Sequence, residues 1–149
     1  MELAASLRTP KIPHRREMAF LDVVKSYDPE SHITEVEVRL SEDKRYYQGG
    51  YINHVWLVEI IAQSAAALFH LERARESKEP RPGYLVGIEE VDIIEAIELT
   101  PGTLLRIQAA IENEFFPCGY FSFSVKCEEI LVACAKMKFI VDDQEELSH

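Results

Sequence analysis

Between Val55 and Phe69, an otherwise apolar stretch carries only three polar side chains, Glu59, Gln63 and Ser64. Glu59 and Gln63 are four residues apart, so in a helix they lie on one face. A carboxylate in such surroundings must be paired, protonated or facing a cavity, because burying an isolated charge is costly. Glu59 is therefore the leading candidate for acid–base chemistry, and the alternative is a structural Glu that is hydrogen-bonded across a subunit interface.

Chain length and charge narrow the classes of function. With 149 residues and 47% hydrophobic content, the chain fits one domain, 1–149, in which 1–12 and 142–149 are expected to be loosely ordered tails. A formal net charge of −10 opposes nucleic-acid binding, because phosphate recognition needs clustered Lys and Arg. We therefore expect no nucleic-acid partner, whereas small ligands and acidic, solvated surfaces stay open.

No metal, cofactor or membrane span is predicted. The three cysteines, Cys118, Cys127 and Cys134, lack the spacing of a zinc site, and the chain has no P-loop, GxGxxG or GxSxG element. The N-terminus has no sustained apolar segment, and no later stretch approaches the ~18 apolar residues of a membrane span. Reduced thiols in a cytosol are the simplest interpretation, so we expect a cytoplasmic protein.

The apolar stretch belongs to one long predicted helix, from Asn53 to about Glu79. Asn53 can cap this helix, its first half must be buried, and its charged second half emerges into water. Residues 1–17 are expected to form an extended lead-in rather than a helix. A strand is expected at 18–24, before the turn at Asp28-Pro29.

The remaining elements are predicted to be strands. A strand is expected at 35–40, because Val36, Val38 and Leu40 alternate with charged residues. Only strand signals follow the helix, with a tight turn at 128–130. These four strands are expected to form a meander, with ranges of 84–95, 103–115, 119–128 and 131–141.

The order of two strands, a long helix and four strands favours an α+β fold. A strongly curved antiparallel sheet wrapped around the one central helix would bury that helix, and this is the hotdog architecture. Such a sheet leaves open edges, which pairing between subunits would satisfy. We therefore expect a homodimer or a higher oligomer.

Five short motifs occur in an order and spacing that a known family shares. They are Ile12-Pro13-His14-Arg15 with Phe20-Leu21-Asp22, Tyr47-Gln48-Gly49, Glu59-Ile60-Ile61-Ala62-Gln63-Ser64-Ala65-Ala66, Tyr84-Leu85-Val86-Gly87-Ile88, and Pro101-Gly102. Over about 12–141, the chain thereby resembles the hotdog-fold 3-hydroxyacyl-acyl-carrier-protein dehydratases of the FabA/FabZ type.

One position departs from that family's pattern. The family carries a catalytic His directly after the Gln-Gly pair, whereas this chain has Gly50 there, followed by a shortened loop, Tyr51-Ile52-Asn53. The chain is thus more similar to a divergent branch of dehydratase-like hotdog proteins, in which the helix Glu and the Ala-Gln motif persist without that loop.

The resemblance implies dehydration of 3-hydroxyacyl thioesters, in fatty-acid synthesis or a related lipid or polyene pathway. Dehydration needs a base for the C2 proton, an acid for the C3 hydroxyl and donors for the thioester oxygen. Glu59 matches the helix carboxylate and is the predicted acid. His54, beside the shortened loop, is the candidate base, with an exposed first-turn residue as the alternative. Five residues separate the two, so they do not share a helical face and could meet only between subunits.

Four further residues are candidates for substrate binding. Gln63 shares the stripe of Glu59, while Gly49, Gly50 and Gly87 could let the backbone approach a thioester or could merely serve turns. The implied partner is acyl-carrier protein or another acyl thioester substrate. Two other functions stay open: a non-catalytic acyl-binding hotdog protein, and an acyl thioesterase that uses the helix carboxylate with water.

Overall fold

The computed structural model describes residues 3, 5–12, 16–76, 83–94, 97–115 and 117–141. The elements, in chain order, are α1 (Ala5–Arg8), a short 3-10 helix (Arg16–Met18), β1 (Val23–Asp28), β2 (Ile33–Arg39), β3 (Tyr47–Gln48), β4 (Tyr51–Ile52), α2 (Trp56–Arg75), β5 (Gly83–Ile93), β6 (Leu104–Phe115), β7 (Cys118–Cys127) and β8 (Ile130–Val141). The predicted tail 142–149 and His14 lie outside the described residues.

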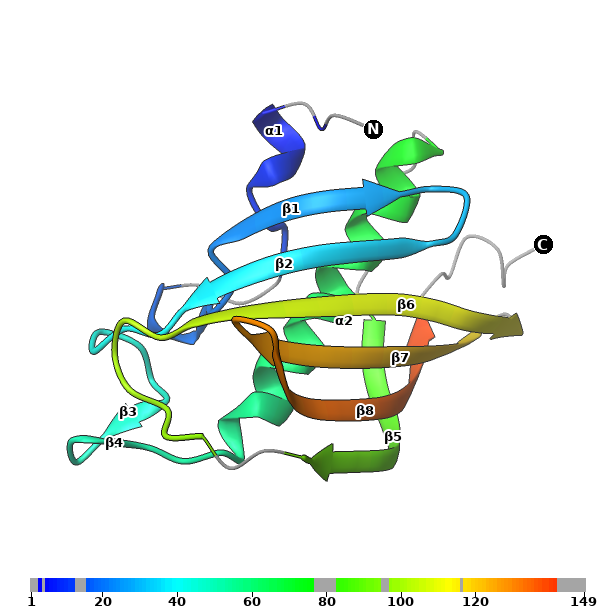
Figure 1. Cartoon of the computed structure of the whole chain (residues 1–149). Helices are drawn as coiled ribbons and strands as arrows, with labels where there is room; N and C mark the ends of the chain where they lie inside the picture. Colours follow the sequence, from blue (N-terminus) through cyan, green and yellow to red (C-terminus); the bar gives the residue numbers. More distant parts are fainter. Residues whose placement is uncertain are drawn as a thin grey trace.

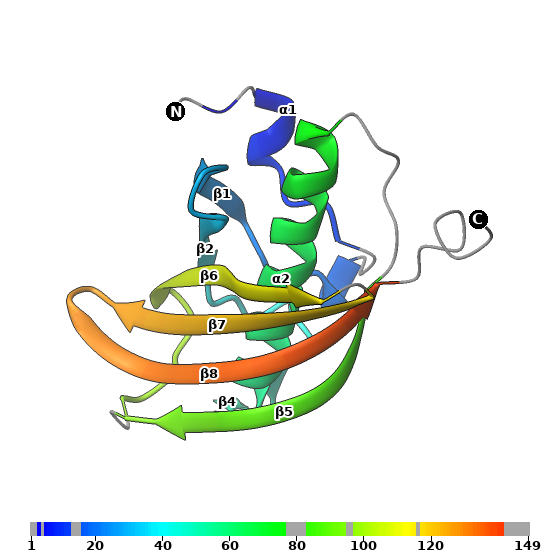
Figure 2. The same cartoon turned by 90° about the vertical axis from the view of Figure 1, so that its right-hand side faces the viewer.

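Six strands form one antiparallel sheet in the order β1-β2-β6-β7-β8-β5. The sheet curves around α2, which lies along its concave side (Figures 1 and 2). β3 and β4 form a separate small hairpin near the start of α2. The structure therefore has the predicted arrangement of a curved antiparallel sheet around one long central helix.

Alternating side chains produce the core on the concave side. In β7, Phe121, Phe123 and Val125 are buried while the residues between them are partly exposed, which confirms the predicted alternation. β2 buries Val36 and Val38 in the same way. Because one slip in register would turn every apolar side chain outward, this pattern fixes how the strands pair.

Helix α2 meets the sheet along one broad face. Its buried residues are Leu57, Ile60, Ile61, Gln63, Ser64, Ala65, Ala67, Leu68 and Leu71. The partly exposed residues of the helix include a strip made by 59, 62, 66, 70 and 73. Asn53 does not cap the helix as expected, because the N-cap position is Val55 and no side chain caps it; the Asn53 Oδ1 instead accepts a hydrogen bond from the Val55 N–H at 2.9 Å, ahead of the helix. The helix itself begins three residues later, at Trp56.

Three local predictions were wrong. The strand expected at 18–24 begins only at Val23, because the backbone of Met18 and Phe20 bonds to a side chain of α2 instead of to another strand. The lead-in is not extended throughout, since Ala5–Arg8 forms one helical turn that packs Leu7 on the core. The loop expected at 51–53 contains strand β4.

The predicted meander of four strands was also wrong in its order. β6, β7 and β8 follow one another across the sheet, but β5 pairs with β8 at the far edge. β2 occupies the other side of β6, with Val36 opposite Ile107. The connection after β5 must therefore cross from one edge of the sheet to β6. The ranges of the four strands agree with the prediction to within two residues at each end.

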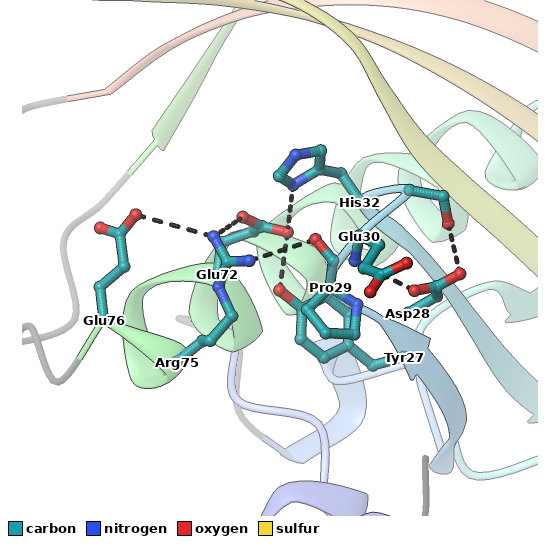
Figure 3. Close-up of polar contacts among 9 residues, drawn as sticks. Tyr27, Asp28, Pro29, Glu30, His32, Glu72, Arg75 and Glu76 are labelled. Atoms are coloured by element: carbon teal, nitrogen blue, oxygen red, sulfur yellow. Dashed lines mark hydrogen bonds and ion pairs between the residues drawn. The ribbon is translucent and has the colours of Figure 1, made fainter.

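The last turn of α2 is tied to the β1–β2 turn by a polar cluster (Figure 3). Glu72 Oε1 accepts a hydrogen bond from the Tyr27 hydroxyl at 2.7 Å and lies 2.9 Å from His32 Nδ1. Arg75 lies 3.5 Å from the second oxygen of Glu72 and donates to the Pro29 carbonyl at 3.1 Å. Burial, and then the bond to Glu72, raise the pKa of Tyr27, so this hydroxyl stays a donor.

His70 provides a test of how the partly exposed strip of α2 is packed. Burial, and secondly the charge of Lys11, hold the pKa of His70 below its ordinary value of 6.5. His70 therefore binds a proton more readily in the unfolded chain than in the folded one. Its contribution to the free energy of unfolding is fully present above pH 6.5 and is lost as the pH falls through the lower pKa of the folded state. We expect His70→Gln to lose less stability than the wild type between about pH 7.5 and about pH 5.5, measured by urea unfolding. An unchanged pH dependence would contradict this packing.

Candidate active site

Glu59 lies in the first turn of α2, on the partly exposed strip. Gln63, one turn later, is fully buried, and its Nε2 donates a hydrogen bond to Glu59 Oε1 at 3.2 Å. The same Nε2 donates to the Met18 carbonyl at 2.7 Å, and the Phe20 N–H donates to Gln63 Oε1 at 2.9 Å. The structure thus brings together the two polar residues whose spacing predicted a shared helical face.

The side-chain amide of Gln63 has only one orientation that satisfies these partners. Two acceptors, the Met18 carbonyl and the Glu59 carboxylate, face its NH₂ group, while one donor, the Phe20 N–H, faces its oxygen. A flipped amide would place its oxygen against both acceptors and its NH₂ group against the donor. Each bond therefore helps to hold Gln63, and through it Glu59, in one arrangement.

His54 lies in the loop before α2, with its side chain half-buried. Its Nε2 is 2.7 Å from the Ile97 carbonyl, in the connection between β5 and β6. A carbonyl can only accept, so Nε2 carries the proton. The partner of His54 within one chain is thus this carbonyl rather than Glu59.

Gly49 and Gly50 form the two-residue turn of the β3–β4 hairpin. Tyr47 pairs with Ile52 and Gln48 with Tyr51, which leaves the two glycines as the loop. Their φ angles of +61° and +76° are those of a type I′ turn, which favours glycine at both positions. Gly87 differs, because its φ is not positive and an added Cβ would meet only Lys138 Cβ at an ordinary 3.9 Å.

A hollow in the described part of the chain lies far from Glu59. It has a volume of about 290 Å³ and is lined by Ser26, Tyr27, Asp28, Ser31 and Ile33, at the β1–β2 turn. Tyr27 bonds Glu72, which is 13 residues beyond Glu59 and therefore roughly 20 Å along the helix. This hollow is at the other end of the helix from Glu59 and Gln63, so we place the candidate chemistry at Glu59 and not there.

The described part of the chain holds no group of three or more His, Cys, Asp or Glu side chains that could bind a metal ion. Its three cysteines are free. None of its helices is long and apolar enough to cross a membrane.

The family becomes clear when the chain is compared with known proteins. A family model described as ApeP-like, ApeP dehydratase, matches residues 9–148. The chain belongs to this family. The predicted resemblance to the hotdog-fold dehydratases is thereby confirmed.

Individual relatives have low sequence identity to this chain. The 3-hydroxyacyl-[acyl-carrier-protein] dehydratase FabZ of Lactobacillus helveticus is 25% identical over 138 residues, which cover 89% of this chain and 88% of that protein. The dehydratase heterocomplex ApeI:P from Xenorhabdus doucetiae superposes with a TM-score of 0.77 at 20% identity, over 92% of this chain and 91% of the other. A hypothetical thioesterase protein with coenzyme A, from Streptococcus pneumoniae, superposes with a TM-score of 0.60 at 10% identity, over 80% and 86%. These likenesses confirm the hotdog fold.

Sequence reasoning missed the backbone partners of the site. The Met18 carbonyl and the Phe20 N–H bond Gln63, and the Ile97 carbonyl bonds His54. Any residue has these backbone groups, so no residue type marked them. One signal was present: a buried amide such as Gln63 needs partners, and an apolar helix cannot supply them.

Alanine at the three glycines tests their roles. We expect Gly49→Ala and Gly50→Ala each to lower the free energy of unfolding by about 1 kcal/mol, because a side chain disfavours positive φ. Gly87→Ala, where the backbone has no such requirement, should leave stability nearly unchanged. Thermal and urea unfolding measure all three, and equal stability losses at Gly49 and Gly87 would contradict the turn assignment.

Proposed function

We propose that this protein dehydrates 3-hydroxyacyl thioesters, with the Glu59 carboxyl as the acid–base group. The observation that carries the proposal is a carboxylate in the first turn of the central helix, held by a buried amide, in a chain of the ApeP-like dehydratase family. Dehydratase chemistry needs such a group, fixed in place yet open to a substrate.

The chemistry can be written with a single carboxyl group. Glu59 takes a proton from C2 of the acyl chain, and the electron pair forms the C2=C3 double bond as the C3–O bond breaks. The proton then passes to the departing hydroxyl, which leaves as water, and the carboxylate is restored. In the transition state for removal of the C2 proton, negative charge develops on the thioester oxygen. The positive end of the α2 dipole stabilises this charge.

The backbone N–H groups at the helix start are already in use. Val55 donates to the Asn53 side chain, and the N–H groups of Trp56, Leu57 and Val58 donate to carbonyls three residues earlier. Within this chain, the N-terminus of α2 therefore contributes its dipole, and direct donors to the thioester oxygen must come from another segment or subunit.

The role of His54 is tied to the oligomeric state. With its Nε2–H on the Ile97 carbonyl, the ring has Nδ1 as its acceptor, which suits a base. It precedes the helix and does not share the face of Glu59, so we propose that the two act together across a homodimer, in place of the single-carboxyl route. His54 Nδ1 then takes the C2 proton, the Glu59 carboxyl gives its proton to the departing hydroxyl, and the proton on His54 returns to Glu59 before the next turnover. The edge strand β5 supports such an assembly, because Tyr84, Val86 and Ile88 are each about half exposed at an unpaired edge.

A different hotdog chain is the second candidate partner. The FabA/FabZ-type dehydratases that this chain resembles carry a His where this chain has Gly50, and a structural relative is named as a dehydratase heterocomplex. A partner chain that supplies the missing His would complete the site. For the substrate, we propose an acyl group on acyl-carrier protein, as in the name of the Lactobacillus helveticus relative, within lipid synthesis in the cytoplasm.

Two other activities remain as alternatives. Hydrolysis of an acyl thioester would use the same carboxylate with a water molecule, and the likeness in fold to a hypothetical thioesterase protein supports it. Binding of an acyl group without turnover is supported by Gly50, at the position of the catalytic His in the FabA/FabZ-type dehydratases. Release of free thiol identifies the first alternative, and acyl binding without any product identifies the second.

Substitution of the helix carboxylate tests the proposal. We expect Glu59→Gln to lower kcat for enoyl thioester formation by at least about 100-fold, because the amide cannot transfer the proton. The matched control is Glu72→Gln, which removes a carboxylate at the other end of the same helix and should lower stability while leaving turnover intact. Full activity in Glu59→Gln would rule out this assignment.

Mixing two variants tests a site shared between subunits. Glu59→Gln and His54→Ala homodimers should each be inactive, whereas a mixed dimer restores one site that has both wild-type residues. We therefore expect activity to reappear after the two variants are mixed and subunits exchange. If each variant is inactive and the mixture stays inactive despite confirmed exchange, the two residues do not act across subunits.

A further inference from the structure

Residues 17–20, which we call the strut, contact two parts of the molecule, the segment before the β3–β4 hairpin and helix α2. The strut carbonyl of Glu17 accepts a hydrogen bond from the Arg45 N–H at 2.9 Å, in the segment that leads into the β3–β4 hairpin. Its Met18 carbonyl and Phe20 N–H both bond to Gln63 on α2. The strut therefore links the hairpin to the helix through backbone groups.

The strut is also held by the packing of one apolar side chain, that of Phe20. Phe20 is only 1% exposed, and its ring meets the Tyr46 ring edge-on at 4.9 Å between centroids. It also meets the Trp56 ring edge-on at 5.8 Å, at the first residue of α2. Aromatic pairs in this geometry prefer one relative position. Phe20 thus sets the distance between the hairpin segment and the helix start.

Gln63 connects the strut to Glu59 in the candidate active site. Its oxygen is used by the strut, one amide proton is used by the strut, and the other is donated to the Glu59 carboxylate. Because the residue is 0% exposed, water cannot replace a lost bond without rearrangement of the core. The Glu59 carboxylate therefore takes its position from the strut as well as from its own helix.

We propose that Gln63 is a positioning residue, which transmits the fixed placement of the strut to the Glu59 carboxylate. The sequence makes Gln63 a candidate for substrate binding, but both protons of its side-chain amide are donated to protein groups. The inference rests on the proposed function for its effect on turnover. Its structural part, the coupling of residues 17–20 to Glu59, can be measured without any substrate.

The test compares Gln63→Met with Ser64→Ala. Methionine keeps the length of the side chain and removes all three hydrogen bonds, whereas Ser64 is an equally buried neighbour whose hydroxyl donates only to the Ile60 carbonyl within the helix. With a 3-hydroxyacyl thioester of N-acetylcysteamine as the substrate, we expect Gln63→Met to lower kcat by about tenfold to a hundredfold with little change in KM. Ser64→Ala should keep the wild-type kcat even where its melting temperature falls.

Two measurements are independent of turnover. Gln63→Met should speed hydrogen exchange of the Phe20 amide and shift the ¹³C resonance of the Glu59 side-chain carboxyl, and Ser64→Ala should change neither. If Gln63→Met does not fold, Gln63→Glu takes its place, because it keeps an oxygen for the Phe20 N–H while placing a second carboxyl beside Glu59. The same drop in kcat at unchanged KM is then expected.

The outcomes separate this inference from the proposed function. A folded Gln63 variant with wild-type kcat, or with an unshifted Glu59 resonance and a protected Phe20 amide, overturns the positioning role. A wild-type protein that forms no enoyl product overturns the dehydratase proposal, and the exchange and resonance measurements still decide whether Gln63 couples the strut to Glu59.

Discussion

Helix α2 is apolar on so much of its surface that it requires cover from the rest of the chain. The curved sheet covers the face that carries Leu57, Ile60, Ile61 and Leu68, and the segment before β1 adds Leu3 and Phe20 to the same core. What stays partly open is a narrow strip along the helix, and Glu59 lies in it. The need to bury the helix therefore decides where a carboxylate can remain accessible to a substrate while its surroundings stay apolar.

Two carboxylates near opposite ends of this helix have different surroundings. Glu72 is enclosed by Tyr27, His32 and Arg75, so its oxygens serve to hold the helix end against the β1–β2 turn. Glu59 is approached by the amide of Gln63, which is itself fixed by backbone groups. The first arrangement stabilises the fold, and the second presents a carboxylate at the surface of the core. The difference follows from the residues that neighbouring segments bring to each end of α2.

The features that depend on local pattern were predictable from the sequence. The alternation of Phe121, Phe123 and Val125 predicted β7, and the i, i+4 spacing of Glu59 and Gln63 predicted their contact. Features that depend on distant pairing were not. The position of β5 beside β8 depends on which strand occupies the other side of β6, and periodicity within a strand contains no such information.

For the candidate site, the side chains were predictable from the sequence but their backbone partners were not. Side chains with chemical character, Glu59, Gln63 and His54, could be selected by type, but Gln63 and His54 bond to backbone groups of residues 18, 20 and 97. Such groups are identical along the chain, so only the fold selects among them. The β3–β4 hairpin was missed for a related reason: its strands have two residues each, too few for a pattern, although its Gly49-Gly50 turn is a known hairpin signal.

Dehydration at Glu59 requires that the substrate bind with its C2 and C3 atoms beside the carboxylate. A crystal structure of the assembled protein with a non-hydrolysable 3-hydroxyacyl thioester analogue tests this most directly. We predict that the C3 hydroxyl lies within hydrogen-bond distance of a Glu59 oxygen while Gln63 keeps its bonds to Met18 and Phe20. An acyl group bound elsewhere, for example in the hollow at the β1–β2 turn, with Glu59 out of contact, would contradict the account.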